Sequence, residues 1–390
     1  MSMKLISILG STGSIGKSSL SVINLHPDRF KIFALGGFNN VDLLLEQAIK
    51  FKPSYIVTKD LPSKKLLIDK LKDEKLKTKV LFGEEGYSFI ASHEDVTTVI
   101  AAITGSAGLI STIEAAKSGK QILLANKESM VMAGDLLNKI CLENNATLIP
   151  IDSEHNAIFQ VLSSQKDSQE IKKIILTASG GPFREFDIES LKNVTVDQAL
   201  NHPNWKMGKK ISIDSATMMN KGLEVIEASH LFRLNISKIE VVMHPQSIIH
   251  SFVEFIDGSS LSQLGNPDMR VPISYALGYP DRITSGVDGV SLDKLPNLEF
   301  FKPDLKKFRC LDLSYQCLAM GAAHCINLNA SNEVAVEAFL LGKINFMQIP
   351  ELIEKTLLKA EAADVNSVEH ILEIDNLARL EANNILNKLF

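Results

Sequence analysis

Asp152 and Glu154 are two carboxylates, two residues apart, whose type and spacing suggest metal chemistry. They follow residues 146–151, a short apolar run that is typical of a buried strand. In an extended chain, residues i and i+2 point to the same side, so we expect both carboxylates to aim at one point. Clustered carboxylate oxygens are the ligands that Mg²⁺ and Mn²⁺ prefer. An isolated Asp-x-Glu is more often a solvated turn, and only its neighbours favour a metal site.

Glu224 is the natural third ligand of this pair. Its predicted helix carries Leu223 and Val225 beside it, so the carboxylate should be buried and should need a partner. The alternative is a surface glutamate that pairs with Lys221 one turn earlier.

Four polar residues suggest a cradle for a phosphate group. Ser179 precedes two glycines and offers a hydroxyl next to unobstructed backbone N–H groups. Ser215, Asn220 and Lys221 add a second hydroxyl, an amide donor and a positive charge. On its own, Ser-Gly-Gly would more simply be a turn.

His202 and Trp205 lie in a long polar connection that could close over a substrate. We expect a lid near residues 186–208, with Trp205, the only tryptophan, at its tip. The alternative makes Trp205 a core anchor and His202 an exposed loop residue.

The N-terminal segment has the pattern of a dinucleotide-binding turn. An apolar run at residues 5–9 leads into Gly10, Gly13 and Gly16, and a helical pattern follows. Five residues separate Gly10 from Gly16, whereas a Walker A loop has four, so the segment is a poor P-loop. Small residues at a helix N-terminus let the backbone approach a pyrophosphate.

Strand-like and helix-like runs alternate through the first 150 residues, which predicts a doubly wound parallel sheet. In such sheets ligands bind at the carboxyl ends of the strands, so these ends should share one edge. The expected strands are 30–35, 55–57, 79–82, 96–103, 121–125 and 146–151, and the expected helices are 41–51, 64–71, 109–117 and 130–144.

We predict an α/β fold with a Rossmann-like N-terminal domain, a central α+β catalytic domain and a C-terminal helical bundle. The expected bounds are 1–145 for nucleotide binding, 146–278 for catalysis, metal binding and dimerisation, 279–305 for a linker and 306–390 for the helices. Residues 329–332 are interpreted as a capping cluster before Glu333.

Composition limits the class of protein. The 390 residues are 45% hydrophobic and 22% charged, as in ordinary globular proteins, and the net charge of −5 suggests no nucleic-acid partner. No apolar run reaches transmembrane length, and the strand-like start leaves no room for a signal peptide. The four cysteines form no disulfide framework, which favours a cytoplasmic protein.

Seven motifs make the chain resemble a known family along nearly its whole length. The family is 1-deoxy-D-xylulose 5-phosphate reductoisomerase, of the non-mevalonate isoprenoid pathway. The motifs are residues 10–16 (GSTGSIG), 124–129 (LANKES), 151–155 (IDSEH), 178–183 (ASGGPF), 202–205 (HPNW), 214–224 (DSATMMNKGLE) and 243–247 (MHPQS).

The resemblance implies an NADPH-dependent homodimer that rearranges and reduces a sugar phosphate to 2-C-methyl-D-erythritol 4-phosphate. It implies that Asp152, Glu154 and Glu224 bind Mg²⁺ or Mn²⁺, with Co²⁺ as a further option. The implied substrate contacts are Lys127, Ser153, Glu154, Ser179, His202, Trp205, Ser215, Asn220, Lys221 and Glu224, with Lys127, Asp152, Glu154, His202 and Glu224 as the catalytic set. The nucleotide contacts would be Thr12, Gly13, Ser14, Ile15, Gly37, Asn39, Asn40, Asn126, Glu128 and Gly208.

The chemistry of the residues is compatible with that reaction. A bound metal ion would polarise a ketose carbonyl, the carbon skeleton would rearrange by retro-aldol cleavage and re-addition, and NADPH would reduce the resulting aldehyde. A closed lid would exclude water from the reactive intermediate.

The loop after the second predicted strand bears on the choice of cofactor. No acidic residue follows Gly37, so the simplest NAD signature is missing. Relatives often carry a lysine where this chain has Asn39, and a neutral donor binds a phosphate more weakly than a charged one. We therefore expect NADPH to be preferred over NADH, with a reduced margin.

Two other functions fit parts of the sequence. A metal-free NAD(P)-dependent dehydrogenase would not need three converging carboxylates, and its activity would survive EDTA. A non-enzymatic dinucleotide sensor would need neither a lid nor a phosphate cradle, and it would bind ligands without turnover.

Overall fold

The structure is a computed structural model that describes residues 3–163, 170–205, 207–295 and 297–389. Contacts between backbone segments divide it into two compact units. The first comprises residues 1–129, 137–156 and 268–288, and the second comprises 130–136, 157–267 and 289–390. Position 206 of the predicted lid and position 296 of the predicted linker lie outside the described residues.

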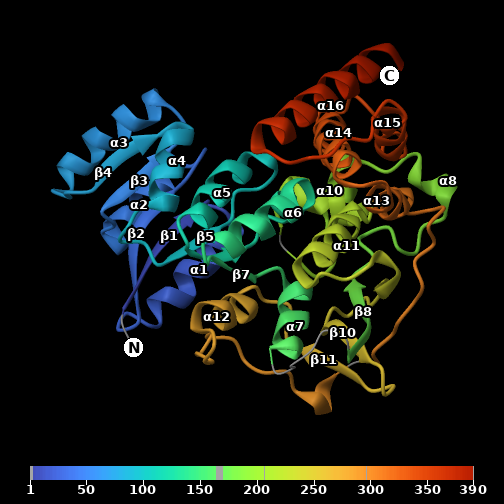
Figure 1. The fold of residues 1–390 in the computed structure, drawn as a ribbon, viewed down its shortest axis with the longest axis horizontal. Coiled ribbons are helices and arrows are strands. Elements are labelled where there is room, and N and C mark those ends of the chain that lie inside the picture. Colours follow the sequence, from blue (N-terminus) through green and yellow to red (C-terminus); the bar gives the residue numbers. More distant parts are fainter. Residues whose placement is uncertain (1–2, 164–169, 206, 296, 390) are drawn as a thin grey trace. The chain divides into compact units, whose positions relative to one another are not determined.

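The first unit is built on a seven-stranded sheet in the order β4-β3-β2-β1-β5-β6-β7, with every ladder parallel. Parallel strands that are buried on both faces read as continuous apolar runs, and all four residues of β5 are buried. The strands are β1 (Lys4–Leu9), β2 (Phe30–Gly36), β3 (Tyr55–Thr58), β4 (Lys79–Phe82), β5 (Thr98–Ala101), β6 (Gln121–Leu124) and β7 (Thr147–Pro150). The intervening helices are α1 (Ser14–Asn24), α2 (Val41–Phe51), α3 (Leu61–Asp73), α4 (Gly83–Ser92) and α5 (Leu109–Lys117), and α12 (Arg270–Gly278) packs on α1 (Figure 1).

Two further helices contribute residues to both units: α6 (Lys127–Glu143) and α7 (Ser153–Leu162).

The chain order of the strands reverses direction at β1, which lies between β2 and β5. Gly10 directly follows β1 and has a φ of +94°. A Cβ atom on this residue would lie 2.5 Å from the carbonyl oxygen of Ala102. Only glycine fits this close approach, so the loop between β1 and α1 passes directly over the end of β5. Ligands of open α/β sheets bind at such a switch point.

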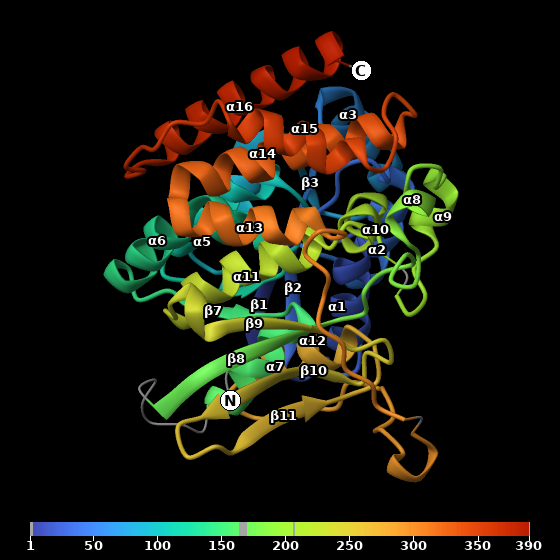
Figure 2. The ribbon, with the colours of Figure 1, turned by 90° about the vertical axis from the view of Figure 1, so that its right-hand side faces the viewer.

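The second unit contains a four-stranded sheet in the order β11-β10-β8-β9. Its strands are β8 (Ile171–Ala178), β9 (Ile239–Met243), β10 (Ile249–Phe255) and β11 (Ser260–Leu264). β10 runs antiparallel to both neighbours, whereas β8 and β9 are parallel. Figure 2 shows the four strands side by side, with α11 and α13 above them in that view.

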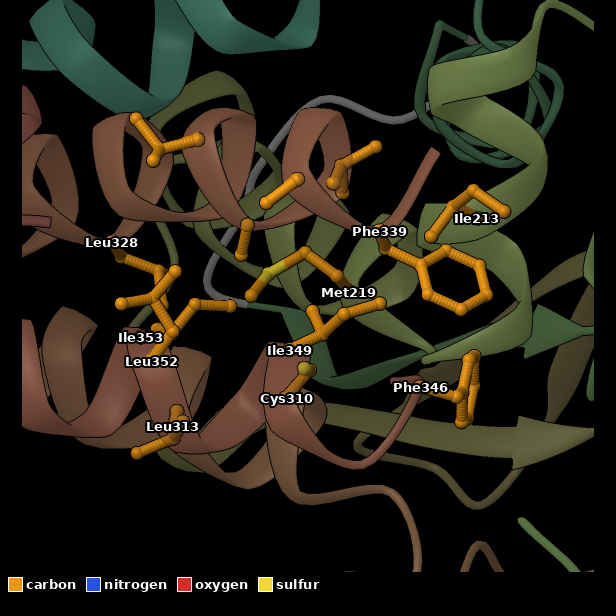
Figure 3. Close-up of a cluster of buried hydrophobic side chains, with 14 of the residues drawn as sticks. Ile213, Met219, Cys310, Leu313, Leu328, Phe339, Phe346, Ile349, Leu352 and Ile353 are labelled. Atoms are coloured by element: carbon orange, nitrogen blue, oxygen red, sulfur yellow. The ribbon is translucent and has the colours of Figure 1, made fainter. Parts of the chain in front are cut away.

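The helices of the second unit form one hydrophobic core. Met219 of α11 and Ile213 of α10 belong to the same buried cluster as Leu328 and Phe339 of α14, together with residues of α13 and α15 (Figure 3). The C-terminal helices therefore brace the two helices that carry the predicted phosphate and metal residues. The elements are α8 (Ile188–Leu191), α9 (Val196–Leu200), α10 (Lys209–Ala216), α11 (Met219–Phe232), α13 (Arg309–Met320), α14 (Ala322–Leu340), α15 (Gln348–Leu357) and α16 (Val368–Leu389).

The predicted fold class is confirmed: a parallel Rossmann-like sheet, an α+β region and C-terminal helices are all present. Among the elements that the sequence analysis missed are α4, α10, α12 and β11.

The extended conformation expected for Asp152 to Glu154 is wrong. α7 begins at Ser153, and the backbone N–H of Asn156 donates to the carbonyl of Asp152 at 2.8 Å. Glu154 is thus in the first helical turn, where residues i and i+2 point to different sides. Any convergence of the two carboxylates comes from the position of Asp152 just before the helix.

The capping interpretation of residues 329–332 is also wrong, because these residues lie inside α14. Their side chains are buried, and the donors of Ser331 and Asn332 are used inside the protein. The Ser331 hydroxyl donates to the carbonyl of Asn327 at 2.7 Å, and the Asn332 amide donates to Asp214 at 2.9 Å. A polar cluster that resembles a helix start is here the buried face of a central helix.

Candidate functional site

The loop between β1 and α1 is shaped to receive an anion. Gly13 is the N-cap of α1 and makes no side-chain cap, so the first N–H groups of the helix, which include those of Ser14 and Ile15, have no partner within the helix. Gly13 and Ser14 are exposed. A Cβ atom at Gly16 would overlap the backbone of Ser11, which explains the third glycine. This arrangement is that of a pyrophosphate site at a helix N-terminus.

Gln47 of α2 supports this loop from behind, and the sequence analysis missed it. Its side-chain amide donates to the Ser11 carbonyl at 2.9 Å and accepts from the Ser11 hydroxyl at 2.7 Å. Gln47 and Ser11 are both buried. The only signal in the sequence is a polar residue on the apolar face of a predicted amphipathic helix.

The loop after β2 lies beside the glycine loop. A Cβ atom at Gly37 would lie 2.9 Å from a methyl carbon of Thr12, so the two loops touch. Asn39 and Asn40 are exposed, but Asn40 is also the N-cap of α2 and accepts from the Leu43 N–H at 3.0 Å.

Asn126 has its side chain fully used within the protein. Its amide nitrogen donates to the carbonyls of Gly105, at 2.9 Å, and Ile103, and its oxygen accepts from the N–H and the hydroxyl of Ser129. It therefore ties the end of β6 to the loop after β5. Glu128, the other predicted contact here, is buried in the first turn of α6.

Lys127 and Asp152 form a short ion pair in the first unit. The Lys127 ammonium lies 2.5 Å from a carboxylate oxygen of Asp152, and both side chains are largely buried. Next to them the Ser153 hydroxyl donates to Glu154 at 2.6 Å. The structure thus brings together four of the predicted substrate and metal residues at the carboxyl ends of β6 and β7.

In the second unit, residues 179–181 pack directly against Ser215, the next of the predicted phosphate-binding residues. Gly180 and Gly181 have φ values of +81° and +67°, which side-chain-bearing residues rarely adopt. A Cβ atom at Gly181 would lie 2.7 Å from the Ser215 carbonyl oxygen. The glycines therefore allow Ser179 and Ser215 to share one small region.

Glu224 is buried and hydrogen-bonded within its own helix. Its carboxylate accepts from the Asn220 amide at 2.5 Å and from the Lys221 ammonium. Glu224 is 0% exposed and Lys221 3%, which rules out the surface pair that the sequence left open. The pairing with Lys221 is real, but it lies in the interior.

The 202–205 segment is folded around the His202 ring. The backbone N–H groups of Asn204 and Trp205 donate to Nδ1 at 3.2 and 2.9 Å, and Nε2 lies 2.9 Å from the Ser179 hydroxyl. Burial lowers the pKa of His202 to about 4, so the ring is neutral at physiological pH. His202 and Trp205 are both half-buried, and Gly208 is the exposed N-cap of α10.

Comparison with known proteins identifies the family. Family models described as 1-deoxy-D-xylulose 5-phosphate reductoisomerase, its C-terminal domain, and the DXP reductoisomerase C-terminal domain match residues 6–134, 148–232 and 264–381. The chain belongs to the 1-deoxy-D-xylulose 5-phosphate reductoisomerase family.

Relatives that carry this name match the chain over nearly its full length. The protein from Nitrosospira multiformis is 51% identical, with 96% of each chain covered, and that from Nitrosomonas europaea is 52% identical, with 97% of this chain and 92% of the relative covered. A solved reductoisomerase in complex with NADPH, fosmidomycin and magnesium gives a TM-score of 0.95 at 48% identity, with 99% of each chain covered. The Zymomonas mobilis enzyme in complex with NADPH gives 0.93 at 40%, with 100% of each covered.

The neutral, half-buried His202 predicts a pH dependence of stability for this reductoisomerase. The pKa of His202 is lower in the folded protein than its ordinary value of 6.5, so the unfolded chain binds the proton more readily. We expect its contribution to stability to be present above about pH 6.5 and to be lost as the pH falls toward 4. Urea midpoints of the wild type and His202→Gln, measured between pH 7.5 and 4, should converge at low pH. Parallel pH profiles of the two proteins would contradict this assignment.

Proposed function

We propose that this protein converts 1-deoxy-D-xylulose 5-phosphate to 2-C-methyl-D-erythritol 4-phosphate with NADPH and a divalent cation. The proposal is carried by a glycine turn at a helix N-terminus, together with the Ser-Gly-Gly and carboxylate clusters, in a chain that matches reductoisomerases over nearly their whole length. The product belongs to non-mevalonate isoprenoid biosynthesis.

We assign the glycine loop and Gly37 to NADPH, because the turn exposes helix N-terminal N–H groups next to the end of β2. A metal-free dehydrogenase would have no use for Glu224, a fully buried carboxylate. A sensor would have no use for the phosphate cradle.

We propose that Asp152 and Glu154 of the first unit, and Glu224 of the second, supply the ligands of one Mg²⁺, Mn²⁺ or Co²⁺ ion. The donor set fits, because it consists of carboxylate oxygens, the ligands that hard divalent cations prefer. The metal ion when bound polarises the substrate carbonyl, and NADPH supplies the hydride. Lys127 fixes the position of Asp152.

The substrate phosphate is assigned to Ser179, Ser215, Asn220 and Lys221. Lys221 would add a positive charge to this cradle, next to its ion pair with Glu224. Trp205 and His202 would cover the substrate and exclude water.

Direct proof of the reaction is NADPH-dependent turnover of 1-deoxy-D-xylulose 5-phosphate under anaerobic conditions with Mn²⁺. Activity that persists in EDTA would favour a metal-free dehydrogenase, and binding without turnover would favour a sensor.

Changing Glu224 to Gln tests the metal assignment. The substitution keeps the shape and removes the charge, so we expect kcat/KM at limiting Mn²⁺ to fall by about a hundredfold or more. Isothermal titration with Mn²⁺ should show the loss of affinity directly. Asp312→Asn, which removes a carboxylate on α13 that pairs with Arg309, is the control for general effects of charge removal. Normal turnover of the Glu224 variant at limiting Mn²⁺ would refute the assignment.

We propose that two copies of the chain form a homodimer through the sheet of the second unit. β11 is an edge strand of this sheet, and exposed apolar side chains surround it, including Leu261, Leu264 and Ile256. Phe300 is 43% exposed and contacts Phe252 on the sheet. An unpaired strand edge with apolar neighbours favours pairing with a second copy.

Light scattering should give a mass of two chains for the wild type. A charge at the edge strand, in Leu261→Glu, should shift the protein toward the monomer by opposing burial of that strand. Leu341→Glu, at an exposed leucine just after α14, should stay dimeric. A monomeric wild type, or dissociation of both variants alike, would reject this interface.

We place the protein in the cytoplasm, because its four cysteines are buried free thiols rather than disulfides. Burial raises the pKa of Cys141 to about 11 and those of Cys310 and Cys317 to about 12, which keeps these thiols unreactive. Within the described residues, no helix is both long enough and apolar enough to cross a bilayer.

A further inference from the structure

We propose that Asn204 is a positioning residue that holds His202 in one neutral tautomer and thereby makes the Ser179 hydroxyl a hydrogen-bond donor toward the substrate phosphate. This inference rests on the proposed function, because it concerns the same phosphate cradle. Four sets of contacts in the second unit support it, and none of them was visible in the sequence.

The first step concerns the tautomer of His202. Two backbone N–H groups point at Nδ1, and a backbone N–H can only donate. Nδ1 must therefore accept, and in a neutral imidazole the proton then resides on Nε2. The Nε2–H group consequently donates to the Ser179 hydroxyl oxygen, 2.9 Å away.

The second step concerns Ser179. Its oxygen also accepts from the Gly181 N–H at 3.2 Å. A hydroxyl oxygen has two lone pairs and one proton, so these two donors fill its accepting capacity. What remains is the O–H group, which can only donate, and an anionic phosphate oxygen is a strong acceptor for it.

The third step concerns what fixes the segment. The side-chain amide of Asn204 donates to the Pro245 carbonyl at 2.6 Å and to the Ser247 hydroxyl at 2.9 Å. These two bonds join the 202–205 segment to the turn that follows β9. Without them, the N–H groups of residues 204 and 205 would lose their fixed direction toward the His202 ring.

The turn itself is rigid. His244 donates from Nδ1 to the Glu299 carbonyl at 2.9 Å and accepts at Nε2 from the N–H groups of Ile248 and Ile249, both at 3.2 Å. Its ring stacks on Phe300 with centroids 4.7 Å apart. Ser247 has a φ of +52°, an unusual value for a residue with a side chain, and this conformation belongs to the turn that presents its hydroxyl to Asn204.

The test variant is Asn204→Asp, which keeps the shape of the side chain but replaces the donating amide with an acceptor that faces the Pro245 carbonyl. We expect the KM for the sugar phosphate to rise about tenfold with kcat within about twofold, because phosphate contacts serve ground state and transition state alike. Asn384→Asp makes the same chemical change at an exposed residue of α16, and it should match the wild type.

A second readout separates positioning from a general structural role. In protein with ¹⁵N-labelled histidine, the ring nitrogens of His202, assigned by their loss in His202→Gln, should show the Nε2–H tautomer without substrate. Asn204→Asp should convert them to a mixture of tautomers. Ser247→Ala removes one of the two acceptors of the Asn204 amide, so it should change the KM and the tautomer ratio of His202 less. It serves as the test variant if Asn204→Asp fails to fold.

An unchanged KM, or an unchanged single tautomer in the folded variants, would overturn the inference. The tautomer is measured without turnover, so it tests the positioning role by itself. An inactive wild type would count against the proposed function instead.

A second observation, in the first unit, assigns a cation to the cofactor's 2′-phosphate. We infer that Lys59 supplies the positive charge that Asn39 does not. Parallel pairing sets Gly36 opposite Val57, and the Gly37 N–H donates to the Val57 carbonyl at 2.9 Å. Residues 38 and 59 each follow this pair by two positions, which brings them side by side.

The contact is present in the structure, because the Lys59 ammonium lies 5.5 Å from the centre of the Phe38 ring. Phe38 is 45% exposed and lies one residue before Asn39, at the end of the second strand, where dinucleotide-binding sheets hold the adenosine ribose. Asp60 adjoins Lys59, but its carboxylate accepts from the Ser63 N–H at 2.9 Å as the N-cap of α3. A lysine just after the neighbouring strand β3 thus offers the charge that the β2 loop lacks.

Lys59→Gln should raise the dissociation constant for NADPH about tenfold and change that for NADH less than about twofold, since only NADPH has the extra phosphate. Binding is followed by nicotinamide fluorescence, which needs no turnover. Lys64→Gln is the matched control, because Lys64 makes the same contact with Phe82 at the end of the next strand, at 5.2 Å. Equal effects on both cofactors, or no effect on NADPH, would refute the assignment to Lys59.

Discussion

A buried negative charge at Glu224 is the constraint on which the second unit depends. An ionised carboxylate with no exposed surface must be neutralised and hydrogen-bonded by neighbours, and Asn220 and Lys221 do both. Removing one partner of such a pair commonly costs about 3–5 kcal/mol, because the other charge is left uncompensated. The surrounding packing leaves the pair almost fully buried. A side chain at Gly222 would collide with Ser314 of α13, so that helix lies tightly against α11.

This arrangement explains the presence of the C-terminal helices. Asp214, one residue before the phosphate-binding candidate Ser215, is buried between Lys210 at 2.9 Å and Asn332 of α14 at 2.9 Å. The helices therefore act on the cradle by holding its supporting charges, in addition to supplying apolar core. Under the proposed assignment one cation would serve two anions, because Lys221 pairs with Glu224 and would also bind the phosphate. Metal binding at Glu224 would then release part of the Lys221 charge for the phosphate.

Local patterns predicted most of the first unit, because buried parallel strands and glycine turns leave direct traces in the sequence. The apolar run before Gly10 and the spacing of its glycines were sufficient for the strand, the turn and the helix. Glu224 could be predicted as buried from the apolar residues beside it. Periodicity could not show that α7 starts at Ser153, since an Asp-Ser pair suits an extended end and a helix start equally well. Residues 329–332 were wrongly interpreted as a helix cap for a related reason. Their hydrogen-bond partners, such as Asp214, lie more than a hundred positions away in the sequence.

The residues that support the site could not be predicted, because the sequence around each of them contains no motif that indicates its role. Gln47, Asn204 and Ser247 act by reaching loops that are distant in sequence, and single polar residues are common on any surface. The position of Lys59 follows from strand pairing, which requires the register of β2 and β3 rather than the sequence of either one. The same logic separates two kinds of polar residue in this protein. Asn126 and Asn40 have hydrogen-bonding capacity committed to the backbone that shapes the site. Ser179, under the proposed tautomer of His202, has its accepting capacity filled and keeps its proton for donation. A residue type in a motif therefore does not define its role, and the hydrogen bonds already made within the protein determine which groups remain for a ligand.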